Sequence, residues 1–393
     1  MQKRYDFDKV INRVGTNCEK WDSIDLGGED YIALWVADMD FPILDEAVQA
    51  MRSRLDHHIF GYSLRSPGWK SSIINWMSTR HGWSVERKWI LFSPGVVPSI
   101  ALAILSYTAE GDGILIQPPV YPPFSEIVIR GARKLVENPL KLVDGRFEMD
   151  FDDLERKLSS QNVKLALLCS PHNPSGRVWK RDELLRFASI CLNNGVIIFS
   201  DEIHSDIVYS GNKHIPIANI NQETADITIT AMSPSKTFNI VGLSNSEVII
   251  SNEELREKFA KTLNFMHIGG GNIFGAIASE AVYSNGEEWL NQLLDYLEGN
   301  IDFVDRFLST ETPELKLMRP EGAYVTLIDC RKLGLSPIEL ESLFKNKAKV
   351  ILNAGHTFGK QSEGFMRINI AAPRSVLALG LKRIKEAIYP EET

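Results

Sequence analysis

Short apolar runs separated by amphipathic stretches recur along the first two thirds of the chain. These runs are WILF, GILIQ, VKLALLC, GVIIFS, DITITA and EVIIS, at residues 89–92, 113–117, 163–169, 195–200, 226–231 and 247–251. Most of them lack the alternation of apolar and polar positions that marks a half-exposed strand, so they predict strands buried on both faces. The pattern therefore predicts an α/β fold with a mainly parallel sheet covered by helices.

The stretches between these runs predict helices. Residues 181–195, RDELLRFASICLNNG, are amphipathic and finish in Asn and Gly, as helix C-termini commonly do. The pattern changes after Gly286, because residues 287–309 form one long amphipathic stretch. Smaller α/β units around AYVTLIDC and FMRINIA follow it.

Length and composition fit this change of pattern. A chain of 393 residues is long enough for two domains. We expect a large domain at residues 47–285, and a smaller α/β domain formed by residues 1–46 together with 286–393. The hydrophobic fraction of 44% and the charged fraction of 24% are typical of a soluble globular protein. A net charge of -8 argues against non-specific binding to nucleic acid, which requires a basic face.

Cysteine and histidine spacing bears on metal binding and on the cellular compartment. The four cysteines, Cys18, Cys169, Cys191 and Cys330, contain no C-x-x-C pair, so they predict neither a disulfide framework nor a zinc site. The eight histidines contain no pair at helical spacing either, and we expect no metal. Unpaired cysteines suit a reducing cytosol, so the expected location is cytoplasmic.

Two segments bear on membrane association. The N-terminal segment MQKRYDFDKV lacks the apolar stretch of a signal peptide. Residues 89–109 carry no charge and have the length of a membrane span, but Pro94, Gly95 and Pro98 interrupt them. We therefore interpret residues 89–109 as strand, turn and helix, and expect no membrane partner.

Polar and aromatic side chains follow the ends of the predicted strands. Ligands of open parallel sheets bind outside the carboxyl ends of the strands. The groups that follow successive runs are a predicted helix start (Val96 and Val97), an aromatic ring (Tyr121), an amide (Asn173), a carboxylate and an imidazole (Asp201 and His204), and a lysine (Lys236). Each has an ordinary explanation as a turn or rim residue, and SPSK is common turn chemistry. Their placement at one sheet edge predicts a ligand site.

Pyridoxal 5′-phosphate (PLP) is the cofactor that needs this whole set. A lysine amine reacts with its aldehyde, and an acid pairs with its pyridine nitrogen. The start of a helix offers N–H groups to its phosphate. An aromatic ring can stack on its flat ring, and an amide can bond its phenolic oxygen.

The order of these motifs resembles the class I/II aminotransferase superfamily, the fold type I PLP enzymes, over nearly the whole chain. Within it, the segments that resemble the cystathionine β-lyase branch of MalY/PatB type are RVGTNCEKWD, WVADMDFP, GYSLRSPGW, SPGVVPSI, PPVYPPF, HNPSGRVW, SDEIHSDI, PSKTFNIVGL and FMRIN. The resemblance implies a seven-stranded type of sheet between helices, plus a smaller α/β domain.

The resemblance also implies residue roles around the cofactor ring. Lys236 would hold PLP covalently and later move the Cα proton. Asp201 would pair with the pyridinium nitrogen, Asn173 would bond the ring oxygen, and Tyr121 would stack on the ring. His204 stands where transaminases commonly have a tyrosine, and DEIH is the lyase-like form.

Further implied roles concern the phosphate and the substrate. The main chain at Val96 and Val97, with the hydroxyl of Ser233, would cradle the phosphate. Tyr62 would reach the phosphate of a neighbouring subunit, which implies a homodimer with shared active sites. Arg367 would clamp the substrate carboxylate, although taken alone it reads as a surface ion-pair partner.

One departure concerns the phosphate charge. Many relatives carry a phosphate-binding arginine eight residues after the lysine, where this chain has Ser244. The motifs therefore identify no side chain at that position that balances the negative charge of the phosphate.

These features lead to one functional hypothesis and two alternatives. We expect a PLP-dependent C–S β-lyase that cleaves cystathionine or other S-substituted L-cysteines by α,β-elimination to thiol, pyruvate and ammonia. A thiol with a pKa of about 8.5 is a far better leaving group than an alcohol. The alternatives are an aminotransferase of the same fold and a PLP-binding regulatory protein. Pattern and spacing do not decide between elimination and transamination; the resemblance favours the lyase.

Overall fold

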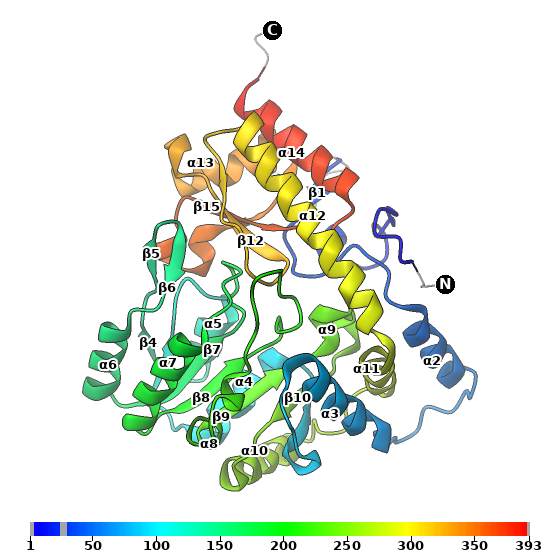
Figure 1. The fold of residues 1–393 in the computed structure, drawn as a ribbon, viewed down its shortest axis with the longest axis vertical. Coiled ribbons are helices and arrows are strands. Elements are labelled where there is room, and N and C mark those ends of the chain that lie inside the picture. Colours follow the sequence, from blue (N-terminus) through cyan, green and yellow to red (C-terminus); the bar gives the residue numbers. More distant parts are fainter. Residues whose placement is uncertain (1–3, 24–29, 391–393) are drawn as a thin grey trace.

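The computed structural model describes residues 4–23 and 30–390, so residues 1–3 of the N-terminal segment lie outside it. Its centre is a seven-stranded sheet in the order β2-β10-β9-β8-β7-β3-β4 (Figure 1). These strands are β2 Ile90–Ser93, β3 Gly113–Ile116, β4 Lys134–Glu137, β7 Val163–Cys169, β8 Ile197–Asp201, β9 Thr228–Met232 and β10 Ser246–Ile249. All six apolar runs singled out in the sequence therefore lie in one sheet.

The sheet is mainly parallel, as expected. Strand β10 runs antiparallel to both of its neighbours, β2 and β9, and the remaining pairs are parallel. As a result, the carboxyl ends of β2, β3, β7, β8 and β9 meet at one edge, together with the start of β10. This edge positions the candidate site. The pattern missed β4, a short edge strand whose side chains are mostly exposed.

Helices cover both faces of the large sheet. The helices of the described chain are α1 Glu19–Asp22, α2 Asp45–Leu55, α3 Pro67–His81, α4 Val96–Tyr107, α5 Pro123–Arg130, α6 Phe151–Ser160, α7 Arg181–Asn193, α8 Gln222–Asp226, α9 Pro234–Thr237, α10 Glu253–Phe265, α11 Ile273–Asn285, α12 Glu287–Glu311, α13 Pro337–Ser342 and α14 Arg374–Ile388. Helices α4, α5 and α10 share one apolar cluster with the strands. Helices α6 and α7 share another.

Burial on two faces explains the near-continuous apolar runs. Leu165 of β7 lies in the cluster of α4, α5 and α10, whereas its neighbour Ala166 lies in the cluster of α6 and α7. Ile114 and Leu115 of β3 divide in the same way. Successive side chains of a strand point to opposite faces, so both faces require apolar residues here.

A second, four-stranded antiparallel sheet has the order β11-β12-β15-β14. Its strands are β11 Lys316–Leu317, β12 Val325–Asp329, β14 Asn353–Ala354 and β15 Phe365–Asn369. Two further pairs complete the strands: β1 Ile32–Ala33 runs parallel to β13 Val350–Ile351, and β5 Lys141–Val143 forms a hairpin with β6 Arg146–Glu148. Through β1, the N-terminal segment joins the C-terminal third. The long helix α12 and helix α14 pack beside this sheet (Figure 1).

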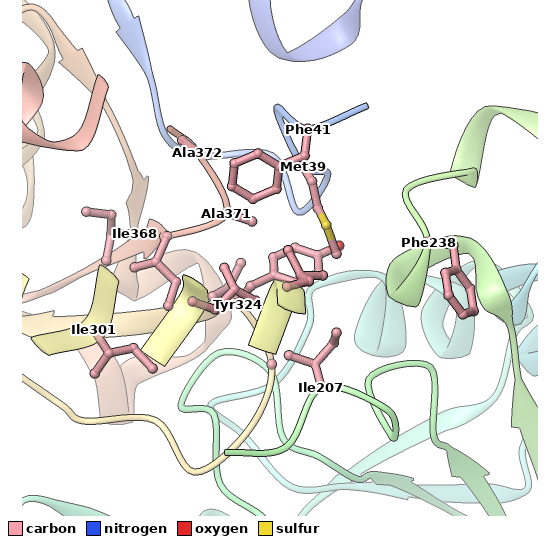
Figure 2. Packing of buried hydrophobic residues seen from close by; sticks show 14 of the residues in the cluster. Met39, Phe41, Ile207, Phe238, Ile301, Tyr324, Ile368, Ala371 and Ala372 are labelled. Carbon is pink, nitrogen blue, oxygen red and sulfur yellow. The ribbon is translucent and has the colours of Figure 1, made fainter. Parts of the chain in front are cut away.

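A large apolar core joins the N-terminal segment to both sheets. Figure 2 shows Met39 and Phe41 of that segment near Tyr324 and Ile368, with Phe238 just beyond α9 in the same cluster. Phe41 is 3% exposed and Tyr324 is fully buried. This packing fixes residues 35–41 over the edge at which the parallel strands end.

The uncharged segment 89–109 forms a short 3-10 turn, strand β2 and helix α4, as its proline and glycine residues predicted. Among residues 4–23 and 30–390, no helix has both the length and the apolar composition that a bilayer crossing requires.

Candidate active site

A cavity of about 740 Å³ opens at the edge where the parallel strands end. Its wall is made by residues that follow β2, β3, β7, β8 and β9, by residues 35–41, and by the small sheet. Eight of the ten residues singled out in the sequence line it: Val96, Val97, Tyr121, Asn173, Asp201, His204, Lys236 and Arg367. These eight residues are up to 271 positions apart in the chain, from Val96 to Arg367.

Lys236 lies in the single turn of α9 that follows β9. Ser233 caps this turn by accepting a hydrogen bond from the amide of Ser235, and Pro234 occupies its first position. The Lys236 ammonium donates a hydrogen bond to the main-chain oxygen of Ala37. Burial lowers the pKa of Lys236 to about 8, although the negative charge of Asp38 acts to raise it. Lys236 therefore loses its proton far more readily than an exposed lysine, although most of it stays protonated at pH 7.

Asp201 is the last residue of β8 and is 5% exposed. One carboxylate oxygen accepts a hydrogen bond from the amide of Ile203 at 3.1 Å. Burial raises the pKa of Asp201 to about 7, and the positive charge of Lys236 opposes this rise. A buried carboxylate is costly unless a cation compensates it. The site is therefore suited to a positively charged group placed against Asp201.

His204 stands beside Asp201 on the same wall. Its ring meets Tyr324 edge-on, with ring centroids 5.8 Å apart. Burial, together with the positive charges of Lys236 and Arg367, lowers the pKa of His204 to about 3, so the imidazole is neutral. Its Nδ1 atom is buried and has no hydrogen-bond partner among the described residues.

Arg367 enters the cavity from the middle of β15. Its Nη1 donates to the side-chain oxygen of Asn173 at 3.0 Å, and its Nη2 donates to the side-chain oxygen of Asn353 at 2.6 Å and to the main-chain oxygen of Trp35 at 2.7 Å. The guanidinium also packs over the ring of Phe358. Within the described chain, Nε has no partner. These contacts hold the guanidinium in one orientation.

The start of α4 and the ring of Tyr121 form another part of the wall. Gly95 precedes the helix, and Val96 and Val97 begin it. The free N–H groups and the positive end of a helix favour an anion at this position. Tyr121 follows β3, and burial raises the pKa of its phenol, so the ring is uncharged.

Ser233, which we expected to bind phosphate, does not line the cavity. Its hydroxyl donates to the main-chain oxygen of Asn245 at 2.7 Å, so its single proton is already engaged. The next serine, Ser235, lines the cavity instead. The phosphate contact of Ser233 therefore stays a prediction.

Tyr62 also lies away from the cavity. It is fully exposed in the segment between α2 and α3. Because its predicted target belongs to a neighbouring subunit, the structure of one chain does not test that role, which stays a prediction.

The sequence reading missed a buried ion cluster that shapes the cavity wall. Arg13 donates to Asp38 at 2.6 Å and to Asp40 at 2.6 Å. Lys20 is fully buried and pairs with the other oxygen of Asp40 at 2.7 Å. Two aspartates within the otherwise apolar WVADMDFP were the available signal. This cluster anchors residues 35–41, whose Ala37 oxygen contacts Lys236.

A second missed group lies behind Lys236. Buried Asp206 accepts hydrogen bonds from Thr237 at 2.7 Å, from His81 at 2.8 Å and from Trp76 at 2.9 Å. Because Thr237 follows Lys236 directly, Asp206 anchors the turn that carries the lysine. The signal in the sequence was the second aspartate of SDEIHSDI, in a segment otherwise assigned to the cofactor.

The residues present fit PLP. Among the residues that the structure describes, Asp201 has no ion-pair partner to offset its burial, and the pyridinium nitrogen of PLP would supply one. Lys236 has the lowered pKa that a reaction with an aldehyde requires. The unpartnered Nδ1 of His204 and Nε of Arg367 are polar atoms that a bound molecule can satisfy. Across the described residues, no cluster of side chains is arranged to hold a metal ion.

Comparisons with known proteins agree with this geometry. A sequence model described as aminotransferase class I and II matches residues 29–384. Cystathionine beta-lyase PatB of Bacillus subtilis is 44% identical over 97% of this chain and 99% of its own length. Protein MalY of Escherichia coli is 32% identical over 98% of this chain and 99% of its own. The solved PLP-bound C-S lyase from Staphylococcus hominis superposes with a TM-score of 0.91 at 35% identity, covering 98% of this chain and 99% of that one.

Proposed function

The chain belongs to the aminotransferase class I and II family, and we propose that it is a PLP-dependent carbon–sulfur β-lyase. It cleaves cystathionine or another S-substituted L-cysteine by α,β-elimination, and the products are a thiol, pyruvate and ammonia. The observation that carries PLP chemistry is the meeting of Lys236, Asp201 and Arg367 in one cavity. The full-length similarity to a cystathionine β-lyase favours elimination over transamination.

We propose the following division of labour among the side chains. Arg367 holds the substrate carboxylate, because its guanidinium is fixed by Asn173 and Asn353 and can form a charge-assisted pair. Asp201 keeps a positive charge on the pyridine nitrogen. When bound, PLP supplies an electron sink for the electrons released at Cα.

Lys236 is the group that moves the Cα proton. Only a neutral amine can accept a proton, and burial lowers the pKa of Lys236 to about 8. The neighbouring ion cluster of Arg13, Asp38 and Asp40 fixes the loop whose Ala37 oxygen contacts the lysine. Within the described chain, the base is thus positioned without a direct ion pair that would keep it protonated.

Thioethers of cysteine are the matching substrate class. A thiolate is a good leaving group because a thiol has a pKa of about 8.5, whereas an alcohol ionises far less readily. Loss of the thiolate from Cβ leaves a three-carbon fragment that water converts to pyruvate and ammonia. The reaction needs no 2-oxo acid acceptor, in contrast to transamination.

We also propose a homodimer with shared active sites. Apolar side chains are exposed in succession in the segment before α3, namely Ile59, Phe60, Tyr62 and Leu64, with exposed fractions between 52% and 113%. Such a run on a water-soluble protein favours coverage by another chain. Tyr62 would then reach the phosphate in the partner subunit.

A cytoplasmic location completes the proposal. All four cysteines are free thiols in the structure, which suits a reducing compartment.

The test of the function compares three amino acids without a 2-oxo acid. L-Cystathionine, L-cysteine and L-alanine are given separately to the purified protein, and pyruvate and thiol are followed with time. Pyruvate from both sulfur substrates and none from L-alanine supports the lyase. At most one turnover, accompanied by conversion of the cofactor to its amine form, would support an aminotransferase instead.

A further inference from the structure

Asn245 is a buried amide on the cavity wall with no assigned role. The residue is 4% exposed and belongs to the cavity wall, with its Cβ close to Gly275 of α11. Neither its Oδ1 nor its Nδ2 has a hydrogen-bond partner among residues 4–23 and 30–390. A buried amide that makes no hydrogen bond is destabilising, since it has lost its contacts with water without replacement. The amide is thus available to a bound molecule.

The strand register places Asn245 beside the start of α4. Strand β10 begins with Ser246, which pairs antiparallel with Ser93 at the end of β2. The hydroxyl of Ser246 donates to the main-chain oxygen of Ser93 at 2.9 Å. Two residues after Ser93, Gly95 leads into α4. Because the two strands run in opposite directions, Asn245 and the start of α4 lie at the same end of the pair.

This end of the cavity has no cation of its own in the described chain. The basic side chains on the cavity wall are Arg13, Lys236 and Arg367. Arg13 is paired with two aspartates, and Arg367 is held by side-chain oxygens of the small sheet and of the loop after β7. Ser244, which also lines the cavity, carries no charge. A phosphate at this end of the cavity would therefore be bound by main-chain N–H groups and by uncharged side-chain donors.

We propose that the side-chain amide of Asn245 donates a hydrogen bond to the cofactor phosphate at the start of α4. This inference rests on the proposed function, because it takes PLP as the ligand. The Ser233 hydroxyl donates to the main-chain oxygen of Asn245 in this structure, so the Asn245 amide offers a donor that is not already engaged. The side chain therefore selects for the phosphorylated form of the cofactor.

The test compares PLP with pyridoxal, which lacks the phosphate. The apoprotein of the wild type, of Asn245→Ala and of Asn245→Asp is titrated with each compound, and binding is followed by visible absorbance. A hydrogen bond to a charged group predicts that Asn245→Ala weakens PLP binding about tenfold or more. The affinity for pyridoxal should change by less than about twofold on the same argument. Asn245→Asp should weaken PLP binding further, because a carboxylate repels phosphate.

A matched control separates this role from a packing role. Ser279 is also buried and has an unpartnered hydroxyl, but it lies on α11 outside the cavity wall. Ser279→Ala should leave both affinities unchanged. Equal weakening of PLP and pyridoxal by Asn245→Ala, or no change in either, would overturn the inference. If the alanine variant does not fold, the isosteric Asn245→Asp variant tests whether this side chain lies beside the phosphate: it should weaken binding of PLP but not of pyridoxal, and equal weakening of both would overturn the inference.

The failure of this inference is distinguishable from the failure of the proposed function. Binding of PLP by the wild type is measured without any amino acid, so the ratio of the two affinities is independent of turnover. A wild-type protein that binds neither compound would overturn both proposals.

Discussion

Arg367 donates a hydrogen bond to the side-chain oxygen of Asn173 at 3.0 Å, although the two residues are 194 positions apart in the chain. Arg367 belongs to β15 of the small sheet, and Asn173 follows β7 of the large one. The bond therefore ties the group proposed to hold the substrate to a group proposed to hold the cofactor. Holding substrate and cofactor in a fixed relative orientation aligns the reacting bond with the catalytic groups.

Arg367→Lys should impair substrate binding more than folding. A lysine carries the charge but cannot reproduce a two-pronged pair with a carboxylate. We expect kcat/KM for cystathionine to fall about tenfold or more, with a raised KM, since each hydrogen bond to a charged group is worth about 1.5–3 kcal/mol. Steady-state kinetics measure this. An unchanged KM would show that Arg367 does not hold the carboxylate.

Lys236→Ala should abolish turnover. The variant loses both the amine that bonds the cofactor and the base that moves the Cα proton. Visible spectra of the purified protein should lack the absorbance of the lysine-bound cofactor, and no pyruvate should form. Circular dichroism provides the control for folding. Sustained turnover by this variant would refute the assignment of Lys236.

Asp40→Asn should destabilise the N-terminal wall of the cavity. Lys20 is fully buried, and its ammonium lies 2.7 Å from Asp40. Asp40→Asn leaves this ammonium with Asp38, 3.6 Å away, as its remaining partner in the described chain. Breaking a buried pair costs up to about 3–5 kcal/mol. Urea denaturation measures the loss. As a control, Asp30→Asn breaks a pair with Arg383 in which the aspartate is largely exposed, so it should change stability little. Equal effects of the two substitutions would contradict the cluster's role.

Glu247→Gln should flatten the pH dependence of stability. Glu247 is buried beside Tyr283, which donates a hydrogen bond to its carboxylate, and Asp206 adds a like charge. Burial raises the pKa of Glu247 from 4.5 to about 8. Between these values the folded protein keeps a proton that the unfolded chain has lost, so stability falls as pH rises through this window.

The slope that Glu247 contributes can reach about 1.4 kcal/mol per pH unit. Urea denaturation of the wild type and of Glu247→Gln at several pH values from about 5 to about 8 measures it. The variant should lose less stability than the wild type over this range. Parallel curves for the two proteins would mean that Glu247 is not protonated in the folded state.

The sheet and most of the cavity could be predicted from the sequence because their signals are local. Each buried strand is a continuous apolar run. The polar residue after each parallel strand lies at the same edge of the sheet, because the carboxyl ends of parallel strands meet there. The edge strand β4 was missed since its exposed positions break that run.

Contacts between distant segments could not be predicted in this way. Arg13 and Lys20 meet Asp38 and Asp40 only after the N-terminal segment has packed over the sheet edge. The hydrogen bond from Ser233 to the main chain of Asn245 likewise depends on the pairing of β10 with β9, which brings the start of β10 beside the turn of α9. The two aspartates of WVADMDFP indicate a buried charge, but no local pattern identifies their partners or the partner of Ser233.

The most direct measurement is the stoichiometry of products from L-cystathionine with no 2-oxo acid present. Homocysteine, pyruvate and ammonia are quantified together against the amount of enzyme, with Lys236→Ala as the inactive control. A β-lyase should form equal amounts of the three products over many turnovers. Products that stop at one equivalent of enzyme, with the amino group retained on the cofactor and no thiol released, would contradict this function.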